Sequence, residues 1–189
     1  MLQLNFAPFP SIETKRVVLR QLRREDIPQL YALRSNSQVM QHIAREPLKS
    51  MEAAETNFKR ITTGIDNNEW ILWGIVPKDE HKVVGTACLW NIAIEHYRAE
   101  VGYDLLPMYQ GRGLMKEVLK EVLRYAFEEI KLHSIEAQVN PENESSRKLI
   151  AGLGFVQEAH LRENYYYNGQ FRDTVIYSMI NPMPNGVFS

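Results

Sequence analysis

The amino-acid sequence predicts a mixed α/β fold, in which one sheet combines parallel and antiparallel strands. Residues 98–140 have the pattern strand, helix, strand. One helix between two strands implies a right-handed crossover, which leaves the two strands parallel. Residues 155–180 have two strand patterns that meet at Asn168 and Gly169, the pair that most strongly favours a two-residue hairpin turn. The end of the sheet is therefore expected to be antiparallel.

The amino-terminal part of the chain is expected to form one strand and two helices. Alternating apolar residues predict a strand over 16–22. A helix over 26–35 follows, because an acidic cap and Pro28 in the first turn are typical of a helix start. The composition of 51–63 predicts a second helix, and the polar, glycine-containing segment 64–68 is expected to end it.

The middle of the chain is expected to form three strands and a long helix. Two strands, 70–76 and 82–90, are joined by the polar turn 77–81, and 98–106 forms a further strand. In the helix over 111–130 the apolar residues form two adjacent rows, which predict one buried face. These apolar positions are 114, 115, 118, 119, 122, 123, 126, 127 and 130.

The remaining elements before the hairpin are a short strand and a short helix. Residues 134–140 alternate between apolar and polar side chains, which predicts a strand. The segment 141–152 is expected to be a helix capped near Asn143 and ended by Gly152 and Gly154. The tail 181–189 contains two prolines and a glycine and is expected to be mobile.

Length and composition predict one ordinary domain, 1–189, with its core at about 11–180. Hydrophobic residues make up 44% of the chain, which is enough for a sizeable core. The net charge of -1 gives no broad attraction to nucleic acid or to an anionic membrane. Cys88 is the only cysteine, and together with the lack of a membrane-length apolar run it favours a reducing cytoplasm. The five histidines show no ligand spacing, so no metal site is expected.

The most informative segment joins the end of a strand to the long helix through a glycine-rich turn. Helix amides in the first turn have no partner within the helix, and the helix dipole adds positive potential there. The backbone N–H groups that would serve belong to Gly111, Arg112, Gly113 and Leu114. This arrangement predicts a cradle for a phosphate or pyrophosphate.

Two common nucleotide loops fit this turn poorly. A Walker-type loop needs Gly-Lys-Ser or Gly-Lys-Thr, and no such triplet follows Gly111. A dinucleotide fingerprint needs a third glycine three residues after Gly113, where the chain has Lys116. Gln110-x-x-Gly113 instead resembles the coenzyme A pyrophosphate loop of the GCN5-related N-acetyltransferases (GNAT), although Met115 replaces the last small residue of that motif.

The resemblance extends over about residues 11–180 and is similar in detail to the RimJ/RimL type of ribosomal-protein N-acetyltransferase. Four separated segments in the expected order are much more specific than one loop. They are 13–20 followed by Glu25 and Asp26, the fourth-strand segment 99–103, the second coenzyme segment from Asn143 and Ser146 to 153–155, and Glu158.

The resemblance implies a GNAT fold, with a mixed, mostly antiparallel sheet of about seven strands and about four flanking helices. The sheet would splay between its fourth and fifth strands, and the pantetheine arm of acetyl-CoA would lie in the gap. Asn143 could bind a pantetheine amide, or it could only cap its helix. The implied coenzyme-binding residues are Leu105, Leu106, Gln110, Gly111, Arg112, Gly113, Leu114, Met115, Asn143 and Ser146.

Amine attack on a thioester needs a neutral amine, a polarised carbonyl and a proton for the departing thiolate. The resemblance places Glu100 and Glu158 near the acetyl group as candidate bases, with an ordinary salt-bridged glutamate as the other reading of each. Many relatives use a tyrosine to protonate the thiolate, but the corresponding residue here is Ile150. Ser146 is the remaining hydroxyl in that segment, either as a proton donor or only as a helix-start residue.

Three functions remain open. The first is acetylation of a protein N-terminal amine, with ribosomal protein as the acceptor that the resemblance suggests. The second is acetylation of a small amine such as a polyamine or an aminoglycoside. The third is a non-catalytic module that binds acyl-CoA. A homodimer also stays open, because the sequence does not determine the oligomeric state.

Overall fold

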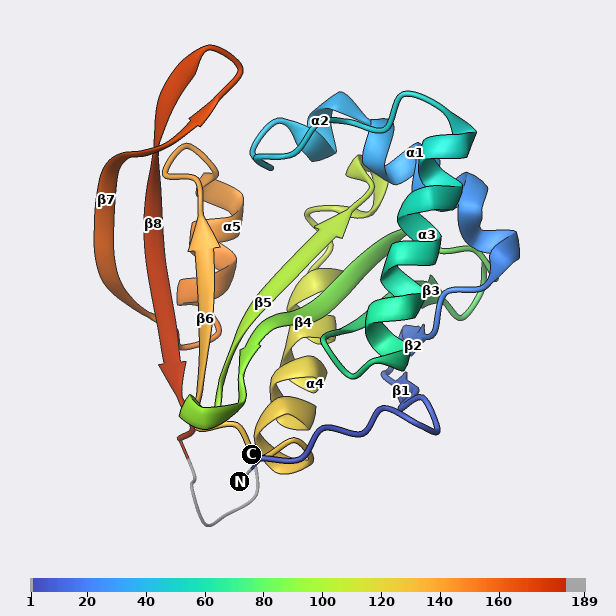
Figure 1. Cartoon of the computed structure of the whole chain (residues 1–189), viewed down its shortest axis with the longest axis horizontal. Helices are drawn as coiled ribbons and strands as arrows, with labels where there is room; N and C mark the ends of the chain where they lie inside the picture. The colour runs from blue at the N-terminus through green and yellow to red at the C-terminus, as the bar shows by residue number, and fades with distance from the viewer. Residues whose placement is uncertain (1, 183–189) are drawn as a thin grey trace.

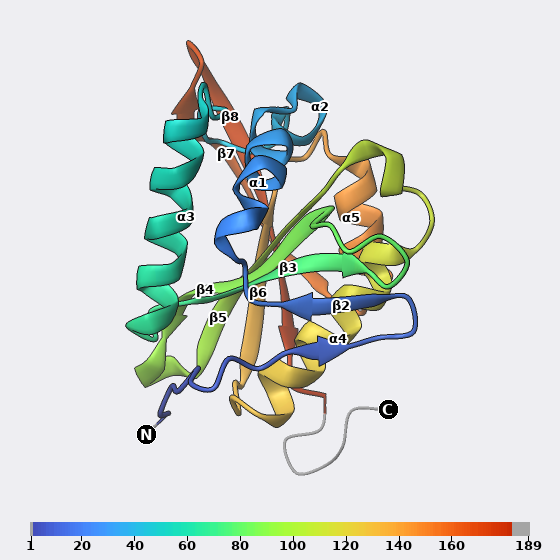
Figure 2. The same cartoon turned by 90° about the vertical axis from the view of Figure 1, so that its right-hand side faces the viewer.

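The computed structural model describes residues 2–182, which form a single eight-stranded sheet with helices on both faces (Figures 1 and 2). The strands are β1 (Ile12–Glu13), β2 (Val17–Arg20), β3 (Ile71–Pro77), β4 (Gly85–Ala93), β5 (Arg98–Leu105), β6 (Ser134–Val139), β7 (Val156–Tyr167) and β8 (Gln170–Ile180). The α-helices are α1 (Ile27–Ser35), α2 (Ser37–Met40), α3 (Met51–Asp66), α4 (Leu114–Glu128) and α5 (Glu144–Ala151). Short 3-10 helices cover Arg24–Asp26, Ile94–His96 and Pro107–Tyr109.

The strand order is β1-β2-β3-β4-β5-β6-β8-β7, and every neighbouring pair is antiparallel except β5 and β6. The crossover predicted from the sequence is therefore confirmed, with α4 as its helix. The sheet has one strand more than expected because the two-residue β1 pairs with β2. Figures 1 and 2 show α1 and α3 on one face, and α4 and α5 on the other.

Helix α4 buries the face that its sequence predicted. Every apolar position of the two rows is at most 8% exposed. The helix packs on the central strands, where the ring of Trp73 on β3 meets that of Tyr125 on α4 edge to face, with centroids 5.5 Å apart. This packing fixes the amino-terminal end of α4 at the end of β5.

The hairpin at the end of the chain is also confirmed, since β7 and β8 are joined at Asn168 and Gly169. Both residues have positive φ, 51° and 79°, as a type I′ turn requires. The expected mobile tail 181–189 lies outside the described residues from 183 onward. Among residues 2–182, no helix combines the length and the apolar character needed to cross a membrane.

The second helix ends within the predicted segment 64–68, but it runs past the predicted bound at residue 63, because α3 continues to Asp66. Gly64 lies inside the helix, where a Cβ atom would be only 1.9 Å from the ring of Trp70. The indole N–H of Trp70 donates to the carbonyl of Ile61, 3.2 Å away. This glycine therefore makes room for an aromatic ring on the helix instead of ending it.

Candidate active site

The sheet opens between β5 and β6, the strands that correspond to the predicted fourth and fifth. Only three residue pairs join these strands, and the last is Glu100 with Glu136. Beyond this pair the two strands no longer pair with each other, although β5 continues to Leu105 and β6 to Val139. Figure 1 shows the two strands diverging. The predicted splay is present, and Glu100 lies where it begins.

Glu100 is a buried carboxylic acid without full hydrogen bonding. It is 7% exposed, and its Oε2 has no hydrogen-bond partner among the described residues. Burial, together with the nearby charge of Glu136, raises its pKa from 4.5 to about 7, while a hydrogen bond from the Asn91 side chain acts in the opposite direction. A carboxylate with such a pKa can accept a proton near neutral pH.

The second predicted carboxylate, Glu158, lies elsewhere. It is exposed on the edge strand β7, and β6 and β8 separate β7 from β5. Its Oε1 accepts a hydrogen bond from Ser178 on β8, and Ser178 is opposite Glu136 on β6. The structure therefore does not pair Glu100 with Glu158. It places Glu136, which the sequence reasoning missed, beside Glu100 and forms an acidic row of Glu100, Glu136 and Glu158 across four strands.

The glycine-rich turn has the geometry of an anion cradle. Gly111 and Gly113 both have left-handed backbones, with φ of 73° and 70°, a conformation that costs other residues about 1 to 2 kcal/mol. Within residues 2–182, the backbone amides of 111–115 donate no hydrogen bond. The Met115 side chain is 8% exposed in the core, so it leaves the cradle clear.

The other predicted residues of this segment tie the turn to the sheet. The Gln110 side chain donates to the Leu105 carbonyl over 2.8 Å, so it braces the turn from within. The Leu106 N–H donates to the Val84 carbonyl over 2.9 Å, which leaves no free donor at Leu106. Backbone amides alternate in direction along a strand, so the Leu105 N–H points away from β4, toward the opening.

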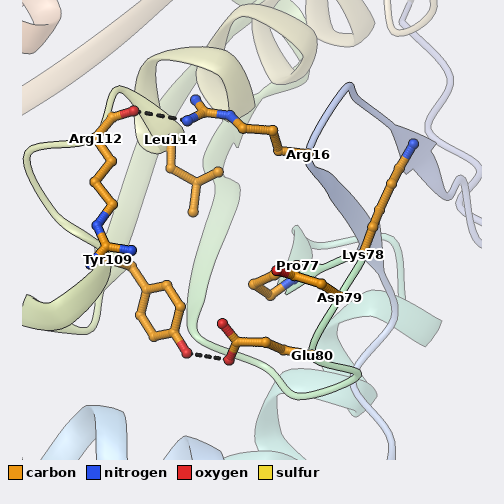
Figure 3. Close-up of a pocket in the computed structure, with 8 residues that line it drawn as sticks. All are labelled: Arg16, Pro77, Lys78, Asp79, Glu80, Tyr109, Arg112 and Leu114. Carbon is orange, nitrogen blue, oxygen red and sulfur yellow. Dashed lines mark hydrogen bonds between the residues drawn. The ribbon is translucent and has the colours of Figure 1, made fainter.

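A cavity of about 320 Å³ lies beside the turn, between the turn and the loop after β3. Figure 3 shows the residues that line it. Arg112 and Leu114 line it from the turn, and Arg16 reaches across from the start of β2 to the Arg112 carbonyl. On the far side, the Tyr109 hydroxyl donates to Glu80. The side chain of Arg112 thus lies outside the row of amides that forms the cradle.

Ser146 lies in the first turn of α5, across the opening from β5. Its hydroxyl is 2.6 Å from that of Tyr103 on β5. Burial raises the pKa of Tyr103 to about 12, and its bond to Ser146 acts in the opposite direction, so both hydroxyls are protonated at neutral pH. The Asn143 side chain accepts a hydrogen bond from the Ser146 N–H over 3.1 Å, which confirms its capping role. Tyr103 lies in the segment 99–103 that carries the resemblance, but its contact with Ser146 could not be predicted, because only the fold brings β5 and α5 together.

A buried ion pair holds α1 against the face of β5 opposite to the one on which Tyr103 lies. The Nε of Arg34 is 3.1 Å from a carboxylate oxygen of Asp104, and both side chains are buried. The other oxygen of Asp104 accepts hydrogen bonds from the Thr86 N–H and hydroxyl, 2.9 and 2.6 Å away. Above this pair, the Tyr167 hydroxyl at the hairpin tip donates to the Arg45 carbonyl in the loop after α2. These contacts frame the face on which Glu100 lies.

Cys88 has no sign of reactivity, because burial raises the pKa of its thiol to about 12 and keeps it protonated. Within the described part of the chain, no three His, Cys, Asp or Glu side chains are grouped to hold a metal ion. The chemical groups of the site are therefore the cradle amides, the buried carboxylic acid and the hydroxyl pair.

Comparisons with known proteins agree with this geometry. A model of the acetyltransferase (GNAT) domain matches residues 16–156. The uncharacterized N-acetyltransferase YoaA of Bacillus subtilis (strain 168) is 34% identical over 174 residues, which cover 92% of this chain and 98% of the relative. Spermidine N-acetyltransferase from Vibrio cholerae, solved with CoA and spermine, has a TM-score of 0.80 at 26% identity and covers 90% of this chain and 98% of that chain. Ribosomal-protein-S5-alanine acetyltransferase from Vibrio fischeri has a TM-score of 0.78 at 28% identity, with 94% and 100% covered.

The chain therefore belongs to the GNAT acetyltransferase family, and the predicted fold is confirmed. It is an acetyl-CoA-dependent N-acetyltransferase with acetyl-CoA as its co-substrate. Its relatives include one enzyme named for spermidine and another named for a ribosomal protein, so the family alone does not select the acceptor.

Proposed function

We propose that this enzyme transfers the acetyl group of acetyl-CoA to the α-amine of a protein N-terminus, with Glu100 as the general base. The observation that carries the proposal is the buried Glu100 carboxyl group at the point where the sheet opens, with one oxygen lacking a partner among the described residues. Its burial raises its pKa to about 7. A base with this pKa suits an amine that is itself only weakly basic.

Amine basicity separates the two classes of acceptor. An α-ammonium group has a pKa of roughly 7.7 to 8.0, and a lysine-like alkylammonium is near 10.4. Each pKa unit corresponds to about 1.4 kcal/mol, so transfer of a proton to Glu100 costs roughly 1 kcal/mol from the α-ammonium and roughly 4 to 5 kcal/mol from the alkylammonium. The carboxylate of Glu100 is thus well matched to an N-terminal amine.

The proposed reaction is one direct displacement. The neutral amine nitrogen attacks the thioester carbon, and the carbon–sulfur bond of the tetrahedral intermediate then breaks. Glu100 takes the proton that the amine loses, directly or through a water molecule. Ser146 gives a proton to the departing thiolate and takes one in turn from its hydrogen-bond partner Tyr103. Solvent then returns a proton to Tyr103 and removes the one held by Glu100, so the cycle closes. The Leu105 N–H, which points into the opening, is free to bind an amide of the pantetheine arm on its way to Glu100.

The coenzyme is proposed to extend from the cradle into the opening. The free amides of 111–115 hold its pyrophosphate, and the pantetheine arm runs along β5 toward Glu100. Residues 100 and 105 are about 17 Å apart along an extended strand, so an extended arm is required to connect the two ends. Glu158 remains a second candidate for the base. A Glu158→Gln variant with an unchanged pH–rate profile would remove it from the mechanism.

A polyamine is the second candidate acceptor, and the acidic row favours it. Glu136 and Glu158 lie on the same row as Glu100, with Arg98 as a loose partner of Glu136 at 3.9 Å. Several carboxylates along one row suit an acceptor that carries several positive charges. A spermidine acetyltransferase of similar fold supports this alternative.

The test compares three acceptors at equal concentration with acetyl-CoA, following CoA release and identifying products by mass spectrometry. They are a lysine-free peptide with a free N-terminal alanine, the same peptide with a blocked N-terminus, and spermidine. We expect turnover only with the free peptide. Turnover with spermidine alone would replace the protein acceptor with the polyamine, and turnover with neither would contradict both candidates.

A further inference from the structure

The cradle is held from outside by a contact that joins distant parts of the chain. Arg16 and Thr14, at the turn between β1 and β2, reach the first turn of α4 and the glycine turn before it. Without such a contact the turn would be poorly restrained, since two of its residues are glycines, which lose the most conformational freedom on folding.

Glu117 on α4 is the centre of this contact. Its carboxylate accepts hydrogen bonds from the Thr14 hydroxyl at 2.6 Å, the Arg16 N–H at 2.9 Å and the Arg16 Nε at 2.7 Å. Partial burial raises the pKa of Glu117, but these bonds outweigh it and hold the pKa below its usual value. Glu117 is therefore ionised and fixed against the β1–β2 turn.

Arg16 also forms a hydrogen bond to the cradle itself. Its Nη1 donates to the Arg112 carbonyl over 2.9 Å, and its Nη2 lies 3.9 Å from where a Cβ of Gly113 would be. The peptide bond is planar and trans, so the Arg112 carbonyl and the Gly113 N–H point in opposite directions. A hydrogen bond that fixes the carbonyl on the Arg16 side therefore fixes the Gly113 N–H toward the opposite side.

We propose that Arg16 and Glu117 are positioning residues, which hold the glycine turn in the conformation that binds the coenzyme pyrophosphate. The proposal rests on the placement of the pyrophosphate at residues 111–115 given above. Arg16 acts through the Arg112–Gly113 peptide and needs no contact with the coenzyme. Glu117 acts through Arg16, whose guanidinium it orients.

The contact is suited to control affinity more than stability. The side chains of Arg16 and Glu117 are 43% and 21% exposed, and exposed ion pairs contribute little to the free energy of folding. Release of the turn instead adds conformational freedom that coenzyme binding must remove. If coenzyme binding must immobilise one or two further groups of the turn, the affinity for acetyl-CoA falls by roughly two- to tenfold.

Arg16→Lys is the main test, because it keeps the positive charge. A lysine ammonium has no planar fork, so it cannot hold Glu117 and the Arg112 carbonyl together in the same geometry. We expect a two- to tenfold increase in the acetyl-CoA Kd by calorimetry and an equal increase in its KM, with kcat at saturation unchanged. Glu117→Gln is expected to act in the same direction.

Lys78→Gln is the matched control. Lys78 lies near Arg16 and pairs with Glu13 over 2.6 Å, but it has no hydrogen bond to the turn among the described residues. Its loss is expected to leave the acetyl-CoA Kd within twofold of the original value. A fall in kcat for Arg16→Lys with no change in KM would overturn the positioning role, as would an effect of Lys78→Gln as large as that of Arg16→Lys.

A second pair of variants separates the positioning contact from the cradle. Gly111→Asp places a negative charge at the turn, and Gly111→Asn is its neutral counterpart of the same shape. A Cβ at Gly111 meets nothing within 4 Å, and both residues tolerate positive φ better than most. If Gly111→Asp alone abolishes acetyl-CoA binding while Arg16→Lys and Glu117→Gln bind normally, the cradle is correct and the positioning role is wrong. If all of these variants bind normally, the cradle assignment is wrong as well.

Discussion

Replacing Glu100 with glutamine should remove activity and make the protein more stable at alkaline pH. Glutamine has nearly the shape of a protonated glutamate but cannot accept the proton of the attacking amine. Turnover should therefore fall by two orders of magnitude or more, in the range typical for loss of a general base. The gain in stability follows from the cost of ionising this buried group.

The size of that gain can be worked out from the pKa of Glu100. Its rise from 4.5 to about 7 corresponds to about 3 kcal/mol at 1.4 kcal/mol per pKa unit. The folded protein binds this proton more tightly than the unfolded chain. The favourable contribution of Glu100 is thus complete below pH 4.5 and is lost as the pH rises through about 7. Above pH 7 glutamine avoids the loss, so Glu100→Gln should gain up to about 3 kcal/mol, or roughly 6 to 12 °C in Tm for a chain of this length.

The assay is thermal unfolding of the original protein and Glu100→Gln at pH 4 and pH 8.5, alongside pH–rate profiles. The two Tm values should agree at pH 4 and separate at pH 8.5, and the rate of the original enzyme should rise with pH through about 7. Glu136→Gln serves as a control, because loss of its charge should move that rise to lower pH. Equal Tm values at pH 8.5, or full activity of Glu100→Gln, would refute the reasoning.

Three further substitutions test other parts of the structure. Gly64→Ala should destabilise the protein in urea, because the added Cβ would collide with the ring of Trp70. In most helices the same change stabilises by about 1 kcal/mol, so a stabilised variant would contradict this packing. Asp104→Ala should cost about 3 kcal/mol or more in the same assay, since it leaves the buried arginine of α1 without its ion-pair partner. A loss below 1 kcal/mol would show that the ion pair is expendable. Tyr103→Phe should lower kcat about tenfold without weakening acetyl-CoA binding, because the hydroxyl that orients Ser146 is gone. An unchanged kcat would remove Tyr103 from proton delivery.

Features with a local cause could be predicted from the sequence. The apolar rows of α4, the cap of α5 at Asn143 and the turn at Asn168 and Gly169 depend on residues a few positions apart, and all are confirmed. The opening of the sheet followed from the family resemblance rather than from periodicity. Its location between β5 and β6 agrees with that expectation.

Features that depend on distant contacts could not be predicted. Gly64 looked like a helix end because nothing in its neighbourhood shows that a tryptophan ring packs against it. Glu100 and Glu158 both lie on strands, but only strand order shows that Glu136 is the neighbour of Glu100. The contact of Ser146 with Tyr103 likewise spans a separation of 43 residues.

Only three residue pairs join β5 to β6, so the sheet has two parts, β1 to β5 and β6 to β8, that are weakly connected. A coenzyme lying between the unpaired edges of β5 and β6 would contact both strands and so connect the two parts of the sheet. At a hundred times its dissociation constant it adds about 2.7 kcal/mol to the folded state, and the two parts should gain this protection unevenly. Amides at 101–105 and 137–139 would then exchange hydrogen more slowly, while β1 to β3 would change little. Resistance to proteolysis in solution should accordingly rise with the concentration of acetyl-CoA.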